Sequence, residues 1–133
     1  MFSPILLEAM QLVTNDVFVF GSNLAGVHGA GAAKFAYEYR GAIWGQGVGM
    51  QGISYAIPTK DEHIETLPLD RIRPYVERFL EFAGDNLGMR FQVTRIGCGL
   101  AGYTDEQIAP MFHNAPPNCS LPPEWNEVLL NIL

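Results

Sequence analysis

Short apolar segments of strand type recur along the chain and are separated by glycine and proline. Residues 17–20 form a continuous apolar run, which predicts a strand buried on both faces. Residues 53–57 predict a second strand, which we expect to stop at Pro58 because proline has no N–H to donate. Residues 91–96 predict a third strand, and a last short strand is expected near residues 119–121.

Apolar positions at helical spacing lie between these strands. Residues 32–39 place alanine and aromatic side chains mostly on one side, and Gly41 is the expected stop. Residues 71–83 carry the clearest amphipathic pattern, with Asp70 as the expected N-cap. Strands that alternate with helices predict an α/β domain.

The ends of the chain carry weaker patterns. A helix is expected over residues 105–113, capped by Thr104, with acidic residues in its first turn. Residues 1–13 have apolar positions at mixed spacing, which suits either a short helix or an edge element. From Glu124 onward we expect a C-terminal tail.

Length and composition favour one globular domain spanning residues 1–133. The hydrophobic fraction of 48% is that of a chain with a packed core. No apolar run approaches the length of a membrane span, and the first residues lack the basic start and cleavage site of a signal peptide. We therefore expect a cytoplasmic protein without a membrane partner.

Charge and chemistry exclude several classes of function. The net charge of −6 is unfavourable for gripping a nucleic-acid backbone. Cys98 and Cys119 form no metal or redox motif, and both are expected to be buried, reduced thiols. Because Cys98 lies in a glycine-rich turn, the alternative is that its thiol faces a ligand. The three histidines show no zinc-binding spacing, so we expect no metal and no cofactor.

Two glycine-rich turns stand out, because each follows a predicted strand and precedes a helical pattern. They cover residues 21–33 and 97–103. Such turns leave backbone N–H groups directed at one point, where a helix dipole adds positive potential. The turns predict a site for a phosphate-containing ligand, and the alternative is that the glycines serve tight turns and close packing. The G-x-G-x-x-G pattern of nicotinamide-dinucleotide sites is missing from the first turn.

Three side chains near these turns each have two interpretations. Asn23 suits hydrogen bonding to a ribose, or stabilisation of its own turn. Lys60 suits pairing with phosphate or attack on a sugar carbon, or an ordinary solvated surface position. Tyr103 suits stacking on a sugar or base, or packing in the core.

At these residues the sequence resembles a macro domain, the family that binds ADP-ribose. The segments FGSN at 20–23 and GAGAA at 29–33 resemble its asparagine and glycine-loop signature. YAIPTK at 55–60 and RIGCGL at 95–100 look like the branch that contains the terminal ADP-ribose protein glycohydrolase. The resemblance covers residues 17–121 and extends to short bacterial and phage proteins of similar type.

The resemblance implies a three-layer α/β/α fold with a mixed central sheet. It implies that the two loops clasp a diphosphate, that Asn23 approaches the distal ribose, and that Lys60 takes the position of the catalytic lysine. ADP-ribose or an ADP-ribosylated substrate is then the partner, with nucleic acid bound only where it is itself ADP-ribosylated. The ligand-binding positions on the loops are Gly29, Ala30, Gly31, Ala32, Gly97, Cys98, Gly99, Leu100, Ala101, Gly102 and Tyr103.

One departure separates the chain from the glycohydrolase pattern. That branch has an aspartate directly after GCGL, where this chain has Ala101. The acid–base partner expected to resolve a lysyl–sugar adduct is therefore missing. Two functions stay open: hydrolysis of an ADP-ribosyl bond, and binding of an ADP-ribose-type nucleotide without catalysis, as a reader or sequestering protein.

Overall fold

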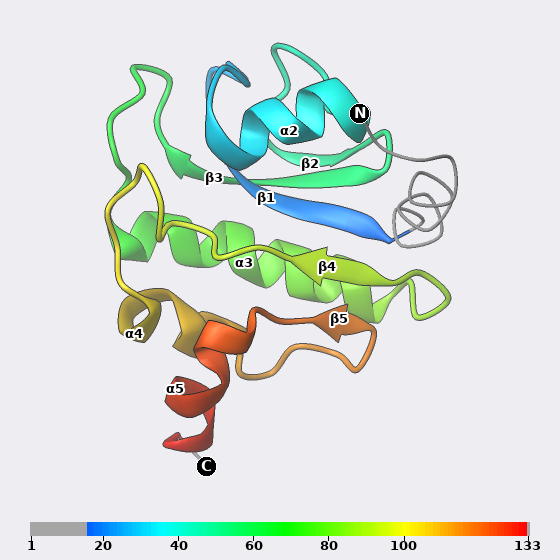
Figure 1. The fold of residues 1–133 in the computed structure, drawn as a ribbon, viewed down its shortest axis with the longest axis vertical. Helices are drawn as coiled ribbons and strands as arrows, with labels where there is room; N and C mark the ends of the chain where they lie inside the picture. Colours follow the sequence, from blue (N-terminus) through cyan, green and yellow to red (C-terminus); the bar gives the residue numbers. More distant parts are fainter. Residues whose placement is uncertain (1–15, 133) are drawn as a thin grey trace, which may run out of the picture.

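The computed structural model describes residues 16–132, which form an α/β fold (Figure 1). The predicted element at residues 1–13 lies outside the described residues. The elements, in chain order, are β1 (Val17–Asn23), α2 (Gly31–Tyr39), β2 (Gly49–Gln51), β3 (Ser54–Lys60), α3 (Leu69–Gly84), β4 (Phe91–Val93), α4 (Asp105–Ile108), the 3-10 helix η1 (Ala109–Phe112), β5 (Cys119–Ser120), the 3-10 helix η2 (Pro123–Trp125) and α5 (Asn126–Leu130).

The strands form one mixed sheet in the order β2-β3-β1-β4-β5. β1 lies parallel to both β3 and β4, β5 is parallel to β4, and β2 is antiparallel to β3. The carboxyl ends of β3, β1 and β4 therefore meet at the same edge of the sheet. In parallel α/β sheets this is the edge where ligands bind.

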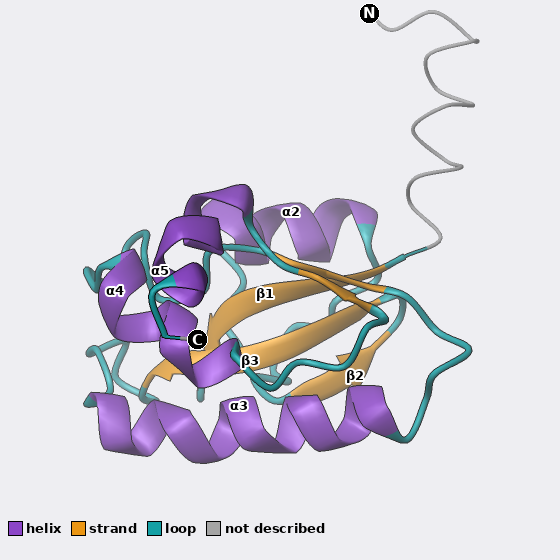
Figure 2. Cartoon of the chain, turned by 90° about the horizontal axis from the view of Figure 1, so that it is seen from below, coloured by secondary structure: helices purple, strands orange, loops and turns teal. Residues whose placement is uncertain are grey.

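Helices cover both faces of the sheet, with α2 on one side and α3 on the other (Figure 2). Side chains of β1 alternate between the two layers. Phe18 and Phe20 pack with the alanines of α2, whereas Val17 and Val19 join the larger core that contains α3. The three-layer α/β/α architecture with a mixed sheet that the sequence predicted is confirmed.

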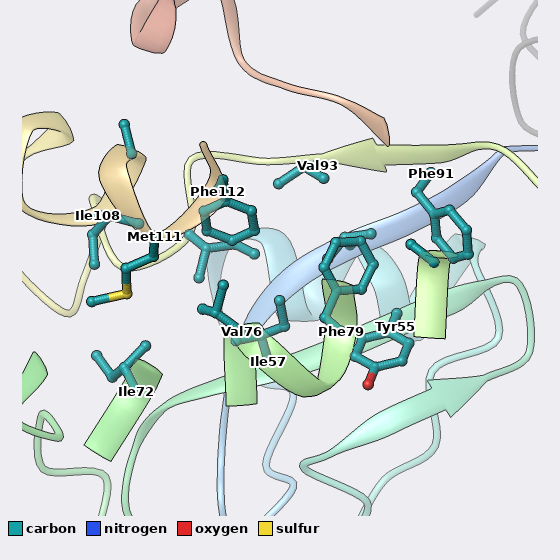
Figure 3. Close-up of a cluster of buried hydrophobic side chains, with 14 of the residues drawn as sticks. Tyr55, Ile57, Ile72, Val76, Phe79, Phe91, Val93, Ile108, Met111 and Phe112 are labelled. Atoms are coloured by element: carbon teal, nitrogen blue, oxygen red, sulfur yellow. The ribbon is translucent and has the colours of Figure 1, made fainter. Parts of the chain in front are cut away.

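The larger core is centred on aromatic rings between the sheet and α3 (Figure 3). Phe79 is fully buried, and its ring centroid lies 5.1 Å from that of Tyr55 and 5.4 Å from that of Phe91. Phe112, on η1, lies 6.4 Å from the same ring. This cluster therefore joins the long helix to the central strands and to the C-terminal part of the chain.

The predicted strand end at Pro58 is wrong, because β3 continues through the proline to Lys60. β2 pairs with β3 only as far as Ala56, so the residues beyond it have β1 as their one neighbour in the described sheet. On that side the register shifts between Ser22 and Asn23, next to the partner of Pro58. A proline is tolerated where the ladder is one-sided and irregular.

Other helix and strand boundaries differ from the pattern by a few residues. The helix over 71–83 is confirmed as part of α3, but Pro68 takes the N-cap position and Asp70 lies in the first turn. β4 stops at Val93, and the Thr94 N–H and hydroxyl, just beyond it, both donate to the carbonyl of Val19, at 3.1 and 2.7 Å. Backbone polar groups at this bend are thereby satisfied by β1.

In the C-terminal third, the Thr104 cap and the short strand near residues 119–121 are confirmed, and the expected tail is wrong. Thr104 does cap α4, and its N–H donates to Gln107 Oε1 at 3.0 Å in a capping box. The helix then tightens into η1, which has Pro110 in its first turn. The expected tail from Glu124 instead forms η2 and α5, and it buries Trp125 completely.

Replacing Phe79 by alanine tests the core. Because Phe79 is 0% exposed, we expect Phe79→Ala to lower the free energy of unfolding by about 3–5 kcal/mol. Leu87, which is 63% exposed, supplies the control, and Leu87→Ala should change it by less than about 0.5 kcal/mol. Urea unfolding measures both, and equal effects would contradict the assigned core.

Candidate functional site

A cleft of about 540 Å³ lies at the carboxyl edge of the parallel strands. Asn23 ends β1, Lys60 ends β3, and Thr94 and Arg95 follow β4; all four line the cleft. The two glycine-rich turns close its sides, since residues of both line it. The fold thus brings together segments that are 70 residues apart in sequence.

The Asn23 side chain fixes the first turn. Its Nδ2 donates to the carbonyl of Val27 at 2.8 Å, and its Oδ1 accepts the Val27 N–H at 2.9 Å. Of the two interpretations of Asn23, the structure shows turn stabilisation, by a side chain that is only 8% exposed yet lines the cleft. A turn held from within presents its amides in a fixed arrangement.

The segment 43–47 packs closely against this turn and is hydrogen-bonded to it. His28 is 1% exposed, and its Nε2 donates to the carbonyls of Ile43 and Gln46 at 2.8 and 3.1 Å. A Cβ at Gly47 would lie 2.0 Å from the Asn23 carbonyl oxygen. Only glycine allows that approach, and the sequence offers no sign of it because the two residues are distant along the chain.

The amino end of α2 opens into the cleft without a cap. Ala30 occupies the N-cap position, and no side chain bonds the first turn, which also lacks acidic residues. Lys34 is the first residue whose N–H bonds within the helix, to the Ala30 carbonyl at 3.2 Å. The N–H groups of residues 29–33 bond no carbonyl of the described residues. Free amides and the helix dipole together favour an anion here.

The second turn is fastened at both of its ends. Tyr103 N–H donates to the Gly97 carbonyl at 2.9 Å, and Gly102 N–H donates to that of Gly99 at 3.0 Å. Gly97 and Gly102 have φ of +76° and +89°, a region that glycine adopts without strain. The N–H groups of residues 99–101 bond no carbonyl within the described part of the chain. A second set of residues with unbonded N–H groups therefore lines the same cleft as the first.

Most of the predicted binding residues line the cleft, and two do not. Gly102 and Tyr103 lie outside its lining. The Tyr103 hydroxyl donates to the Leu67 carbonyl at 2.6 Å, and its ring packs against the core. Of its two interpretations the structure shows packing. Those that line the cleft are Asn23, Gly29, Ala30, Gly31, Ala32, Lys60, Gly97, Cys98, Gly99, Leu100 and Ala101.

Sequence analysis missed several lining residues whose position depends on the fold. Thr59 and Thr94 donate their hydroxyl groups to carbonyls of β1, so both serve the sheet as well as the cleft. Ser22 likewise donates to the Gly47 carbonyl. Val27 and Ile64 add exposed apolar side chains to the cleft. Ser22 and Thr59 lie in the segments FGSN and YAIPTK, whereas the only sequence signal of the other three is that they follow strands.

The charged side chains of the lining are both basic. Lys60 and Arg95 line the cleft, and no aspartate, glutamate or histidine is among its described residues. Arg95 forms two hydrogen bonds with Asp105, at 2.7 and 3.0 Å, and Asp105 also accepts the indole N–H of Trp125 at 2.8 Å. The Arg95 bond lowers the pKa of the Asp105 carboxyl, helped by the Trp125 bond. This chain of contacts anchors Arg95 to the core.

The Cys98 thiol is a poor nucleophile in this setting. Burial, followed by the neighbouring Asp105, raises its pKa to about 11. Its sulfur donates to the Ile96 carbonyl at 3.5 Å. Since the thiolate is the reactive form, Cys98 stays inert at neutral pH although it lines the cleft. Both cysteines are free thiols.

Residues 16–132 contain no group of three or more histidine, cysteine, aspartate or glutamate side chains that could hold a metal ion. None of their helices is both long enough and apolar enough to cross a bilayer.

Comparison with known proteins gives no relative. No protein-family model, no curated protein and no solved structure matches this chain significantly.

A carboxylate placed on the second turn tests the anion site. A Cβ at Gly99 meets no atom within 4 Å and needs no positive φ, so glutamate fits there. We expect Gly99→Glu to weaken pyrophosphate binding more than about tenfold, because like charges would be brought together. Gly88, equally open and outside the cleft, supplies the control Gly88→Glu. Calorimetric titration with unchanged affinity for Gly99→Glu would refute the site.

Acid sensitivity tests the Arg95–Asp105–Trp125 chain. Since folding lowers the pKa of Asp105, its stabilisation is present above the unfolded pKa of about 3.9 and is lost as pH falls through the folded value. We expect Asp105→Asn to cost about 1 kcal/mol at neutral pH and to flatten the decline of melting temperature below about pH 4. Asp85→Asn, on the exposed end of α3, should leave that decline as in the wild type.

Proposed function

We propose that this protein binds ADP-ribose, or a closely related nucleotide diphosphate, in the cleft at the end of β1, β3 and β4, and holds it without hydrolysis. The observation that carries the proposal is that residues 29–33 and 99–101 line one cleft and that their N–H groups bond no carbonyl of the described residues. Two adjoining phosphates are the ligand chemistry that suits two adjoining groups of N–H donors.

The size of the cleft supports a ligand larger than phosphate alone. A volume of about 540 Å³ lies within the range of roughly 300–1,000 Å³ that is usual for nucleotide-sized ligands. Apolar side chains of Val27, Ile64 and Leu100 line it beside the amides. A ligand that combines an anionic centre with sugar and base groups matches this mixture.

Electrostatics supports amides rather than basic side chains as the main phosphate ligands. The chain carries a net charge of −6, and the positive charge of Arg95 is largely neutralised by Asp105 at 2.7 Å. Backbone N–H groups bind anions whatever the net charge of the protein. Lys60 then adds one charged donor to the lining.

Binding without hydrolysis is favoured because the described lining of the cleft has no carboxylate or imidazole that could act as a general base. Attack of water, or release of a sugar from Lys60, requires a general base near the anomeric carbon. The described lining contains no carboxylate or imidazole, and Ala101 stands where the similar glycohydrolases have an aspartate. The Ala101 carbonyl accepts a hydrogen bond from the Thr66 hydroxyl at 3.1 Å.

Hydrolysis of an ADP-ribosyl bond is the second candidate, and the position of Lys60 favours it. The lysine ends β3 within the cleft lining. Once its ammonium had given a proton to water or to the substrate, its amine would form a bond to the anomeric carbon and displace the group attached there. In that case the resolving base would come from the substrate itself.

Calorimetric titration with ADP-ribose, ADP, NAD and cyclic ADP-ribose tests the proposal. We expect binding of ADP-ribose, with no release of ADP-ribose from modified protein or DNA. Lys60→Ala should weaken binding about tenfold, the loss of one charge-assisted hydrogen bond. Lys34→Ala is the control, because Lys34 is exposed, pairs with Glu38 and lies outside the cleft.

The outcomes separate the candidates. Absence of binding by all four nucleotides would refute the proposed function. Release of ADP-ribose by the wild type that disappears in Lys60→Ala would establish the hydrolase in its place.

A further inference from the structure

Ile64 has a left-handed backbone conformation, which is strained for a β-branched residue. Its φ is +65°, and it is the only non-glycine residue with positive φ among residues 16–132. β-Branched side chains avoid this region, where the Cβ approaches the following carbonyl oxygen. Strain of this kind persists only where the surrounding structure imposes it, and it gathers at functional sites.

The turn that carries Ile64 is firmly held. The Asp61 carboxylate accepts the N–H groups of His63 and Glu65 at 2.8 and 3.0 Å. The Asp61 and Ile64 N–H groups donate to the carbonyls of Glu65 and Asp61, at 2.8 and 3.1 Å. These four bonds define the turn without any contribution from the Ile64 side chain. Glycine or asparagine at position 64 would form it with less strain.

The base of the turn is tied to both walls of the cleft. Lys60 and Thr66 form an isolated bridge, so the turn leaves directly from the end of β3. The Thr66 hydroxyl donates to the Ala101 carbonyl on the second glycine turn at 3.1 Å. Ile64 therefore keeps a fixed position relative to Lys60 and to the amides of residues 99–101.

The Ile64 side chain lies in the cleft rather than in a core. It is 44% exposed, belongs to neither hydrophobic cluster and lines the cleft together with Lys60. A strained isoleucine that contributes little to packing gains apolar contact only when something occupies the cleft. Removal of its exposed surface from water would then favour the occupied state.

We propose that Ile64 is a specificity-determining residue, which packs against the sugar or base joined to the diphosphate. The cleft thereby selects nucleoside-linked diphosphates over free pyrophosphate. This inference rests on the proposed function, since the amides must first place the diphosphate. Ile64 makes no contact with the phosphates in this arrangement and contributes only to the selection of what they carry.

Three variants test the inference. Ile64→Gly removes the side chain and the strain, whereas Ile64→Ala removes the side chain and keeps the strain. Ile53→Gly is the matched control, because Ile53 is 42% exposed, has no positive φ and lies outside the cleft. Each is measured by thermal melting and by calorimetric titration with ADP-ribose, with pyrophosphate measured by competition.

We expect both Ile64 variants to bind ADP-ribose about tenfold more weakly, as for the loss of apolar contact in a binding pocket, and to bind pyrophosphate as the wild type does. Ile64→Gly should melt at or above the wild-type temperature, since strain is relieved, whereas Ile53→Gly should melt below it with unchanged affinities. A structural role for Ile64 would instead lower the melting temperature and leave affinity intact.

Two results would overturn the inference, and they differ from failure of the proposed function. Wild-type affinity for ADP-ribose in Ile64→Gly would show that the side chain does not contact the ligand. Equal losses for ADP-ribose and pyrophosphate would show that Ile64 shapes the phosphate site rather than selecting the attached group. If the wild type binds neither ligand, the proposed function itself fails and this inference with it.

Discussion

The cleft depends on backbone N–H groups that the fold leaves without an internal acceptor. Those of residues 29–33 belong to the start of α2, where the geometry of a helix provides no carbonyl for its first turn. Those of residues 99–101 belong to the second glycine turn, which is closed by the N–H groups of Gly102 and Tyr103 instead. Residues 29–31, 99 and 100 are exposed, so that water can satisfy their N–H groups at little cost. An anion that replaces this water meets donors that are already oriented, so little ordering opposes binding.

That orientation comes from the sheet. β1 pairs with β3 on one side and with β4 on the other, all in parallel, so three chain segments leave the sheet in one direction. Side chains hold the segments that follow these strands. The Asn23 amide closes the turn after β1, and the Thr94 hydroxyl, after β4, bonds back to β1. The Tyr103 hydroxyl joins the second glycine turn to the Leu67 carbonyl. Asn23 and Tyr103, which the sequence offered as ligand contacts, thus hold the loops in place. Ligand binding is then proposed to rest on the backbone N–H groups. The same division would allow the proposed anion site in a protein with a net charge of −6.

Asp105 connects a charged residue of the cleft lining, Arg95, to the buried Trp125. Asp105 binds Arg95 at the cleft and Trp125 in the interior, and its carboxyl keeps a lowered pKa as a result. The same carboxylate helps burial to keep the Cys98 thiol protonated. A lining with a neutral thiol, a compensated arginine and one lysine is suited to holding an anion and provides little for proton transfer.

The amino-acid sequence by itself determined the α/β class, the long amphipathic helix α3 and the two glycine turns, because each is encoded by local periodicity or by residues adjacent in the chain. It could not determine that β3 runs through Pro58, since a proline is acceptable there only when β2 has already ended. It could not show that Tyr103 turns away from the cleft, or that Ile64 enters it with φ of +65°. Those outcomes depend on contacts between segments far apart in sequence. Only the tertiary structure decides which neighbour satisfies a polar group, and therefore which groups remain free for a ligand.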